Sequence, residues 1–301
     1  MPLPPNTPEL ANLDLFVSVI ALGSVSKAAA SHGIAQPSAS ARIRSLERRL
    51  GVDLLERSPT GSSPTPAGSL VAGWADSVLQ AAGALTAGVN ALQARRTGRL
   101  RIAASYTIAE YLLPAMLEQF LRNRPDDSVE LDVANSTVVL ERVSSGQIDL
   151  GFVESPGATA GFDEQMIASD ELVAVVGRNH AWSRLGSVPL EALVTTPLIV
   201  REQGSGTREA FEQAVSELGL EAPGTALEIG STAAVRAAVL AGQHPAVMSR
   251  LAVGADIDAG SLVEVDVPEL QVARALRAVW PSGAELSPLA AAFLQHLSQA
   301  T

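Results

Sequence analysis

The order of segments after residue 97 restricts the fold of this chain more than any other feature of its sequence. A short apolar strand, a turn with Ser or Thr and a helix follow one another twice within 100–153, and the same order returns within 198–249. Strands that alternate with helices pair in parallel through right-handed crossovers, and a repeated order indicates an internal duplication. The sequence therefore predicts a C-terminal body of two α/β lobes.

The expected elements of the two lobes correspond to one another. In the first lobe we expect strands at 100–105, 129–134 and 150–153, with a helix at 108–123. In the second lobe we expect strands at 198–201, 226–229 and 246–249, with a helix at 208–218, and a closing helix at 288–298. The turns follow the carboxyl ends of the strands, which is where open α/β sheets bind their ligands.

Four of these turns place hydroxyl or amide side chains at helix N-termini. Free backbone N–H groups and the helix dipole favour an anion there, so two facing lobes would form a cleft for a small anionic or polar molecule. Each hydroxyl could instead be an ordinary helix cap. Arg201 and Arg208 could add charge pairing, or either could form a surface salt bridge. The candidate effector contacts are Ser105, Thr107, Asn135, Ser136, Thr137, Arg201, Gly204, Ser205, Thr207, Ser231 and Thr232.

The N-terminal segment is expected to contain three short helices. The first begins with Thr7 as its cap and Pro8 in its first turn, and it ends at Gly23. The second covers 27–31, and the third covers 37–50 with Pro37 at its start. In the third helix the apolar residues recur at spacings of four and three, which places them on one inward face.

The outer face of helix 37–50 has the side-chain chemistry that reads DNA. Gln pairs with adenine, Ser bonds base edges or phosphate, and Arg grips guanine or phosphate. A solvated amphipathic helix in a small helical subdomain would show the same pattern. The spacing alone therefore leaves both interpretations open.

Motifs and spacings between residues 13 and 68 are those of one family. They are Leu13-Asp14-Leu15-Phe16, Gly23-Ser24-Val25-Ser26-Lys27-Ala28-Ala29, Ala35-Gln36-Pro37-Ser38-Ala39-Ser40, Ile43-Arg44-Ser45-Leu46-Glu47, Leu50-Gly51, Leu54-Leu55-Glu56-Arg57 and Thr65-Pro66-Ala67-Gly68. This run resembles the signature of LysR-type transcriptional regulators. The resemblance implies a winged helix-turn-helix with 37–50 as the recognition helix and 54–66 as the wing.

The resemblance also assigns the DNA contacts and the partner. Gln36, Pro37 and Ser40 would lie at the bases, with Arg42 and Arg44 near the backbone of double-stranded promoter DNA. The full set of candidate DNA contacts is Ser26, Lys27, Gln36, Pro37, Ser38, Ser40, Arg42, Arg44 and Arg57.

A long helix is expected between the two regions, from Pro66 to Ala94. Positions 71, 74, 78, 81, 85, 88 and 92 follow a strict three-four rhythm, which is typical of a coiled-coil seam. From residue 66 to residue 94 the helix makes 28 steps of 1.5 Å and spans roughly 42 Å, long for the surface helix of a monomer. We therefore expect a dimerisation helix with a hinge at 95–98, and the resemblance implies a homotetramer.

Two further motifs of this sequence, Tyr111-Leu112-Leu113-Pro114 and Gly146-Gln147-Ile148-Asp149-Leu150, resemble motifs of the family's effector domain. That domain looks like periplasmic binding proteins. The fold class is then α/β overall, with an all-α winged helix-turn-helix, a linker helix and a two-lobed effector domain. By this analogy the chain crosses between the lobes near 154–161 and returns near 267. The expected domains are 1–66, 67–96 and 97–301, with lobe I at 97–158 and 268–301 and lobe II at 159–267.

The charge distribution permits DNA binding but does not require it. The chain has a net charge of −11, of which residues 1–66 carry +1 and the remainder −12. Phosphate contacts must therefore come from the N-terminal segment. Cysteine is absent, and no apolar run approaches the roughly 20 residues of a membrane span. These features favour a cytoplasmic protein that contacts no membrane.

Two other functions remain open from the sequence. A stand-alone solute-binding protein could use the N-terminal helices for assembly, although the first five residues lack the character of a signal peptide. An enzyme would need a motif such as a Gly-x-Ser-x-Gly elbow, a Walker loop or a His-x-x-x-His pair, and the sequence contains none of them. The four histidines are scattered, so we expect no catalytic residue, no metal site and no cofactor.

Overall fold

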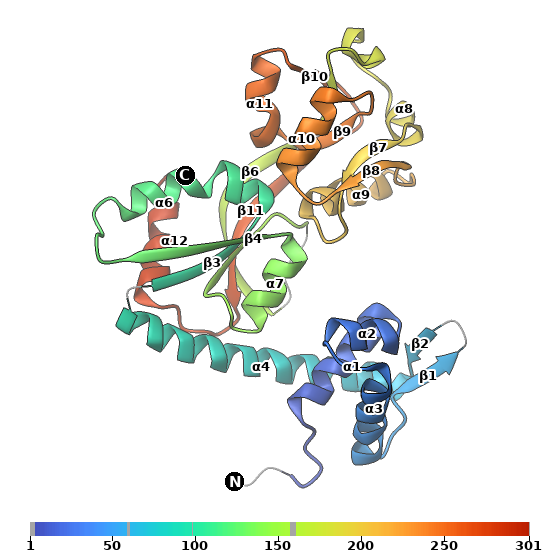
Figure 1. Cartoon of the computed structure of the whole chain (residues 1–301), viewed down its shortest axis with the longest axis vertical. Helices are drawn as coiled ribbons and strands as arrows, with labels where there is room; N and C mark the ends of the chain where they lie inside the picture. The colour runs from blue at the N-terminus through green and yellow to red at the C-terminus, as the bar shows by residue number, and fades with distance from the viewer. Residues whose placement is uncertain (1–3, 59–60, 98, 157–160, 301) are drawn as a thin grey trace. The chain divides into compact units, whose positions relative to one another are not determined.

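The computed structural model describes residues 4–58, 61–97, 99–156 and 161–300 (Figure 1). The chain forms two compact units, Met1–Gly83 and Ala84–Thr301, and each is described by itself. The division falls inside the long helix that we expected to separate the domains, so our narrower domain limits stay a prediction. Among the described residues, no helix is both long and apolar enough to cross a membrane.

The N-terminal unit is a winged helix-turn-helix, as expected. Its elements are α1 (Leu10–Leu22), α2 (Val25–Ser31), α3 (Gln36–Leu50), β1 (Leu55–Ser58) and β2 (Gly61–Pro64). The two strands pair antiparallel to form the wing. Phe16, Ile43 and Leu46 are buried in one core, because the apolar stripes of α1 and α3 face each other.

The expected start of the first helix is wrong. The hydroxyl of Thr7 donates to the carbonyl oxygen of Pro4 at 2.7 Å, so it forms a local turn instead of a cap. The helix begins at Leu10, two residues after the expected first helical residue Pro8, with Glu9 in the cap position. The second helix begins at Val25, two residues before its expected start at 27, and Ser24 caps it by accepting from the backbone N–H of Lys27.

Helix α4 (Pro66–Thr97) is the long helix that the sequence predicts. Its N-terminal turn is capped by Thr65, whose hydroxyl accepts from the backbone N–H of Gly68 at 2.8 Å. The helix continues through Thr97, past its expected end at Ala94, so residues 95–97 of the expected hinge are helical. Residue 98 lies outside the described residues, and the hinge at 95–98 stays a prediction. Of the predicted seam, Val71 packs on the N-terminal core, whereas the side chains of Trp74, Val78 and Leu85 are exposed.

The C-terminal unit contains one mixed sheet of nine strands. Their order is β4-β3-β5-β11-β6-β9-β7-β8, with β10 paired to β6. The parallel strands of lobe I are β3 (Arg99–Ser105), β4 (Ser128–Ala134) and β5 (Leu150–Val153). The parallel strands of lobe II are β7 (Leu198–Arg201), β8 (Thr225–Ile229) and β9 (Ala246–Ser249). Figure 1 shows the two lobes at opposite ends of this sheet.

Two long strands that the sequence analysis missed join the lobes. They are β6 (Phe162–Gly177) and β11 (Val272–Pro281), which pair antiparallel from Leu172 opposite Val272 to Phe162 opposite Pro281. β10 (Leu262–Val265) pairs with the lobe II end of β6. The lobes are therefore connected by two continuous hydrogen-bonded strands and not by loops alone.

Helices cover the sheet in both lobes. The helices of lobe I are α5 (Tyr106–Tyr111), α6 (Leu113–Leu121), α7 (Ser136–Ser144) and α12 (Pro288–Ala300). Those of lobe II are η1 (Ala181–Arg184), α8 (Leu190–Thr195), α9 (Gly206–Glu217), α10 (Thr232–Ala241) and α11 (Arg250–Asp258).

The single helix expected at 108–123 is wrong, because the structure has two helices with a break at Leu112. Pro114 accounts for the break. It lacks a backbone N–H, and its ring would clash with the carbonyl four residues earlier in a continuous helix. Leu113 nevertheless remains fully buried in the lobe I core.

Candidate nucleic-acid interface and effector site

The exposed face of α3 presents most of the predicted DNA contacts. Gln36, Pro37 and Ser38 form its exposed first turn, and Arg42 and Arg44 are exposed further along. On α2, Ser26 and Lys27 are exposed as well. The side chain of Arg57 lies outside the described residues.

The expected outward position of Ser40 is wrong. Ser40 is buried, because it lies on the side of α3 that also holds the core residues Ala39 and Ile43. Its hydroxyl accepts a hydrogen bond from the side-chain amide of Gln36, one helical turn earlier, at 3.1 Å. Ser40 therefore orients Gln36, and Gln36 remains on the exposed face.

Glu47 is a residue of this unit that the sequence analysis quoted only as part of a motif. Its Oε1 accepts from the backbone N–H groups of Leu54 at 3.1 Å and Leu55 at 3.3 Å. These bonds tie the end of the recognition helix to the first strand of the wing. A carboxylate just before the end of a helix gives no sequence signal for such a long-range bond.

The four predicted turns do lie at helix N-termini. Asn135 caps α7 by accepting from Val138 N–H at 3.0 Å, and Ser231 caps α10 by accepting from Ala234 N–H at 3.4 Å. Ser105 and Ser205 precede α5 and α9 but make no cap bond. Both are almost fully buried, and their hydroxyl oxygens have no hydrogen-bond partner among the described residues.

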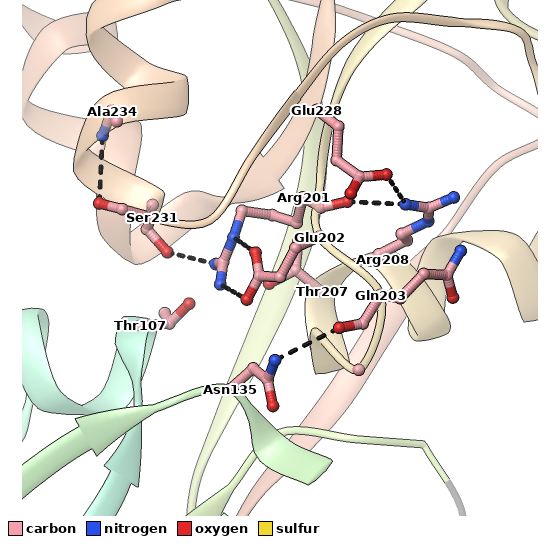
Figure 2. Close-up of polar contacts among 12 residues, drawn as sticks. Thr107, Asn135, Arg201, Glu202, Gln203, Thr207, Arg208, Glu228, Ser231 and Ala234 are labelled. Carbon is pink, nitrogen blue, oxygen red and sulfur yellow. Dashed lines mark hydrogen bonds and ion pairs between the residues drawn. The ribbon is translucent and has the colours of Figure 1, made fainter. Parts of the chain in front are cut away.

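Turns of the two lobes contact each other directly. The side-chain amide of Asn135 in lobe I donates to the carbonyl oxygen of Gln203 in lobe II at 3.3 Å (Figure 2). The backbone N–H of Thr137 donates to the carbonyl oxygen of Gly204, also at 3.3 Å. Gly204 has a φ of +82°, and a Cβ there would lie 2.8 Å from Thr137 Oγ1, so this close approach requires glycine.

Glu154 lies between the lobes and was missed as a site residue. It directly follows β5 and is 1% exposed. Its Oε1 accepts from Thr107 at 3.2 Å and from Thr207 at 3.1 Å, one hydroxyl from each lobe. Its Oε2 has no hydrogen-bond partner among the described residues. An acidic residue immediately after a fully apolar strand is the signal that could have found it.

Ser136 completes the lobe I side of this junction. It is the first residue of α7, and it is completely buried. Its hydroxyl oxygen lies 3.5 Å from the backbone N–H of Glu154, which donates to it. Ser136 therefore holds the backbone at Glu154 in place.

A buried ion pair lies beneath Glu154. Arg274 and Asp170 are opposite each other on β11 and β6, and Arg274 Nε donates to Asp170 Oδ2 at 2.9 Å. Arg274 Nη1 donates to Thr207 Oγ1 at 3.0 Å and lies 3.6 Å from Glu154 Oε1. Ser249 donates to the second Asp170 oxygen at 2.9 Å. One guanidinium thus serves two buried carboxylates.

Arg201, a predicted contact at the end of β7 in lobe II, is buried. Its Nη1 donates to Thr232 Oγ1 at 2.8 Å, and its guanidinium carbon lies 4.8 Å from the centre of the Tyr106 ring. Its Nε and Nη2 donate to the side-chain carboxylate of Glu202 (Figure 2). The ion pair between Arg201 and Glu202 is therefore mostly buried and does not lie at the surface.

Glu110 lies within the electrostatic reach of this site. Burial raises the pKa of the Glu110 carboxyl above its ordinary value, the Arg201 guanidinium opposes that shift, and the Glu154 carboxylate adds to it. The Glu110 carboxyl therefore lies within electrostatic reach of both Arg201 and Glu154. Any anion that enters here meets both a cation and a competing carboxylate.

A winged helix-turn-helix joined to a two-lobed α/β body with buried polar groups between its lobes defines a ligand-responsive DNA-binding regulator. The family model for bacterial regulatory helix-turn-helix proteins of the lysR family matches residues 10–69, and the model for the LysR substrate binding domain matches residues 93–301. The chain belongs to the LysR family of transcriptional regulators.

Curated relatives are similar in sequence to this chain over nearly its whole length. The HTH-type transcriptional regulator Rv2282c of Mycobacterium tuberculosis is 39% identical over 100% of this chain and 99% of its own length. The regulator YeiE of Escherichia coli is 32% identical over 90% of this chain and 89% of its own length.

Two solved structures are similar in fold. The CcmR regulatory domain of Synechocystis PCC6803, solved in complex with 2-PG, is 28% identical with a TM-score of 0.62, over 67% of this chain and 97% of that domain. Full-length CbnR complexed with its target DNA is 23% identical with a TM-score of 0.54, over 97% of this chain and 99% of its own.

Proposed function

We propose that this regulator reads promoter DNA with the exposed face of α3, and that a small anionic effector bound between its two lobes controls promoter activity. The DNA contacts are those predicted, with Ser40 acting through Gln36. We retain 1–66, 67–96 and 97–301 as the domain limits, with the lobes divided near 158 and 267. The protein would act in the cytoplasm.

The DNA-binding part of the proposal is supported by the chemistry of the α3 face. Replacing Gln36 by Ala is expected to remove roughly 1–3 kcal/mol of discrimination at one base pair. Replacing Arg44 by Ala is expected to weaken binding to all sequences and to lower the slope of log affinity against log salt by about 1. Gel-shift titrations with the protein's own upstream DNA at several salt concentrations measure both effects.

The matched control is Arg122→Ala, an exposed arginine that directly follows α6, outside the N-terminal unit. Its DNA affinity and salt slope should equal those of the unmodified protein. Absence of any sequence-specific, salt-sensitive binding by the unmodified protein would instead favour a stand-alone solute-binding protein.

The effector part rests on one observation, the buried guanidinium of Arg201 beside the N-termini of α5 and α10. A buried guanidinium beside helix N-termini supplies the positive charge and the N–H donors that bind a small oxyanion. The 2-PG complex of the CcmR regulatory domain supports a small acid as the class of ligand. A thermal-shift screen of small organic and inorganic anions, including 2-PG, tests the proposal.

Replacing Thr232 by Val removes the hydroxyl that accepts from Arg201 while it keeps the side-chain shape. We expect about tenfold weaker binding of the anion that the screen identifies, since one charged hydrogen bond contributes roughly 1.5–3 kcal/mol. DNA binding without effector should not change. Isothermal titration measures the effect, with Thr225→Val at the exposed start of β8 as the control. Ser105→Ala should weaken the response as well, and unchanged affinity in both variants would contradict this site.

The oligomeric part of the proposal rests on α4. Trp74, Val78 and Leu85 are 66%, 45% and 71% exposed and recur at spacings of four and seven, which places them along one side of the helix. Apolar side chains in this arrangement pack against a second copy of the same helix. The proposed assembly is a homodimer through α4, and the homotetramer follows only from the family.

A further inference from the structure

Glu202 occupies the side of Arg201 that an acidic ligand would bind. Its two carboxylate oxygens accept from Arg201 Nε at 2.8 Å and Nη2 at 2.9 Å, as Figure 2 shows. This two-point contact is the geometry in which arginine recognises the carboxylate or phosphate of a ligand. The protein's own side chain therefore makes the contact expected of an effector.

Arg201 is held in position independently of Glu202. Thr232 accepts from its Nη1, and the ring of Tyr106 from lobe I lies against its guanidinium plane at 4.8 Å. Only 5% of the Arg201 side chain is exposed, so a guanidinium without an anion would be a buried, uncompensated charge. Exchange of one anion for another avoids that cost.

Glu202 is less buried than Arg201. Its side chain is 22% exposed, and it lies in the turn between the last residue of β7 and the first residue of α9. The same turn contributes the carbonyl oxygens of Gln203 and Gly204 that accept from Asn135 and Thr137 of lobe I. A displacement of Glu202 would therefore also disturb the contacts between the lobes.

We propose that Glu202 is an internal anion that occupies the effector position on Arg201, and that the acid group of the effector displaces it. The inference rests on the proposed effector site. It adds which chemical group of the effector binds Arg201 and how that binding changes the contacts between the lobes. The ligand must present two oxygens of one carboxylate, phosphate or sulfate group to Nε and Nη2. Departure of Glu202 releases the 202–204 turn, whose interlobe bonds to Asn135 and Thr137 are the element that responds.

Glu228 offers a matched control. It pairs with Arg208 in the same lobe, with Arg208 Nη1 2.8 Å from Glu228 Oε2, and its side chain is 50% exposed. Replacing either glutamate by glutamine changes the net charge by the same amount. Only Glu202→Gln removes the carboxylate from Arg201 Nε and Nη2. A difference in phosphate affinity between the two variants therefore comes from this contact and not from the change in net charge.

The test titrates the full-length protein with inorganic phosphate at constant ionic strength and follows binding by isothermal titration and thermal shift. We expect Glu202→Gln to bind phosphate at least about tenfold more tightly than the unmodified protein, because the internal competitor no longer reduces the binding-competent fraction. Glu228→Gln should match the unmodified protein. The double variant Arg201→Gln/Glu202→Gln should lose the gain.

Equal phosphate affinity of Glu202→Gln and the unmodified protein, including no binding by either, would overturn the inference. A gain that survives in the double variant would overturn it too, since the phosphate would then bind elsewhere. The proposed effector site fails separately. It fails if the anion found in the screen binds Arg201→Gln as tightly as the unmodified protein.

Discussion

Replacing Arg274 by Ala lowers the free energy of unfolding of the C-terminal unit by about 3–5 kcal/mol, the cost expected when a buried ion pair loses one partner. The side chains of Asp170 and Glu154 are each 1% exposed, and Arg274 is the cation that lies within 4 Å of both. Its removal leaves two carboxylates in an environment that cannot solvate them. Urea unfolding followed by the fluorescence of Trp182 and Trp280 measures the loss.

The same experiment distinguishes charge burial from lost packing. Adding Asp170→Asn to Arg274→Ala removes one uncompensated charge and should recover part of the stability, whereas lost packing would not recover. Arg250 is the control, since it pairs with Glu171 and Glu264 but is 44% exposed. Arg250→Ala should cost no more than about 1 kcal/mol. An equal loss at both arginines would contradict the prediction.

Replacing Gly68 by Ala is expected to abolish specific DNA binding by distorting the N-terminal unit. A Cβ at Gly68 would lie 2.0 Å from the carbonyl oxygen of Leu54, which is backbone and cannot move aside as a flexible side chain would. Overpacking of this kind costs roughly 1–3 kcal/mol or more. Circular dichroism during thermal unfolding and a gel shift measure the two consequences.

Gly73 in the same helix supplies a control of opposite sign. A Cβ there meets nothing within 4 Å, so Gly73→Ala should stabilise α4 by about 1 kcal/mol through helix propensity. DNA binding by that variant should be unchanged. If Gly68→Ala binds DNA normally, the first turn of α4 does not need its close approach to Leu54.

Local features of the sequence predicted most of the elements around the candidate sites. β5, β7 and β9 lie where they were expected, because each is a short apolar run bounded by turn residues. The caps at Ser24, Asn135 and Ser231 were predictable for a related reason, since a cap involves residues only three positions apart. The family signature added the function of the recognition helix, which the periodicity of 37–50 had left open.

Several features depend on residues that are distant in the sequence. Thr107 and Glu154 are 47 positions apart, and Arg274 and Asp170 are 104 apart, so no periodicity relates them. The pairing of β6 with β11 brings the buried ion pair together, and both strands were missed. Ser40 appeared to be an outward residue because its chemistry is polar, but packing of α3 on the core places it inside.

The repeated strand–turn–helix order by itself determined that this protein has two α/β lobes with polar turns at the carboxyl ends of their strands. It also placed Arg201 at the end of a strand, beside those turns. Only the tertiary structure decided what Arg201 contacts, because its partners Tyr106, Thr232 and Glu202 come from both lobes and from the adjacent turn. A sequence pattern specifies which groups are available, whereas the packing of the lobes decides which of them are close enough to bind.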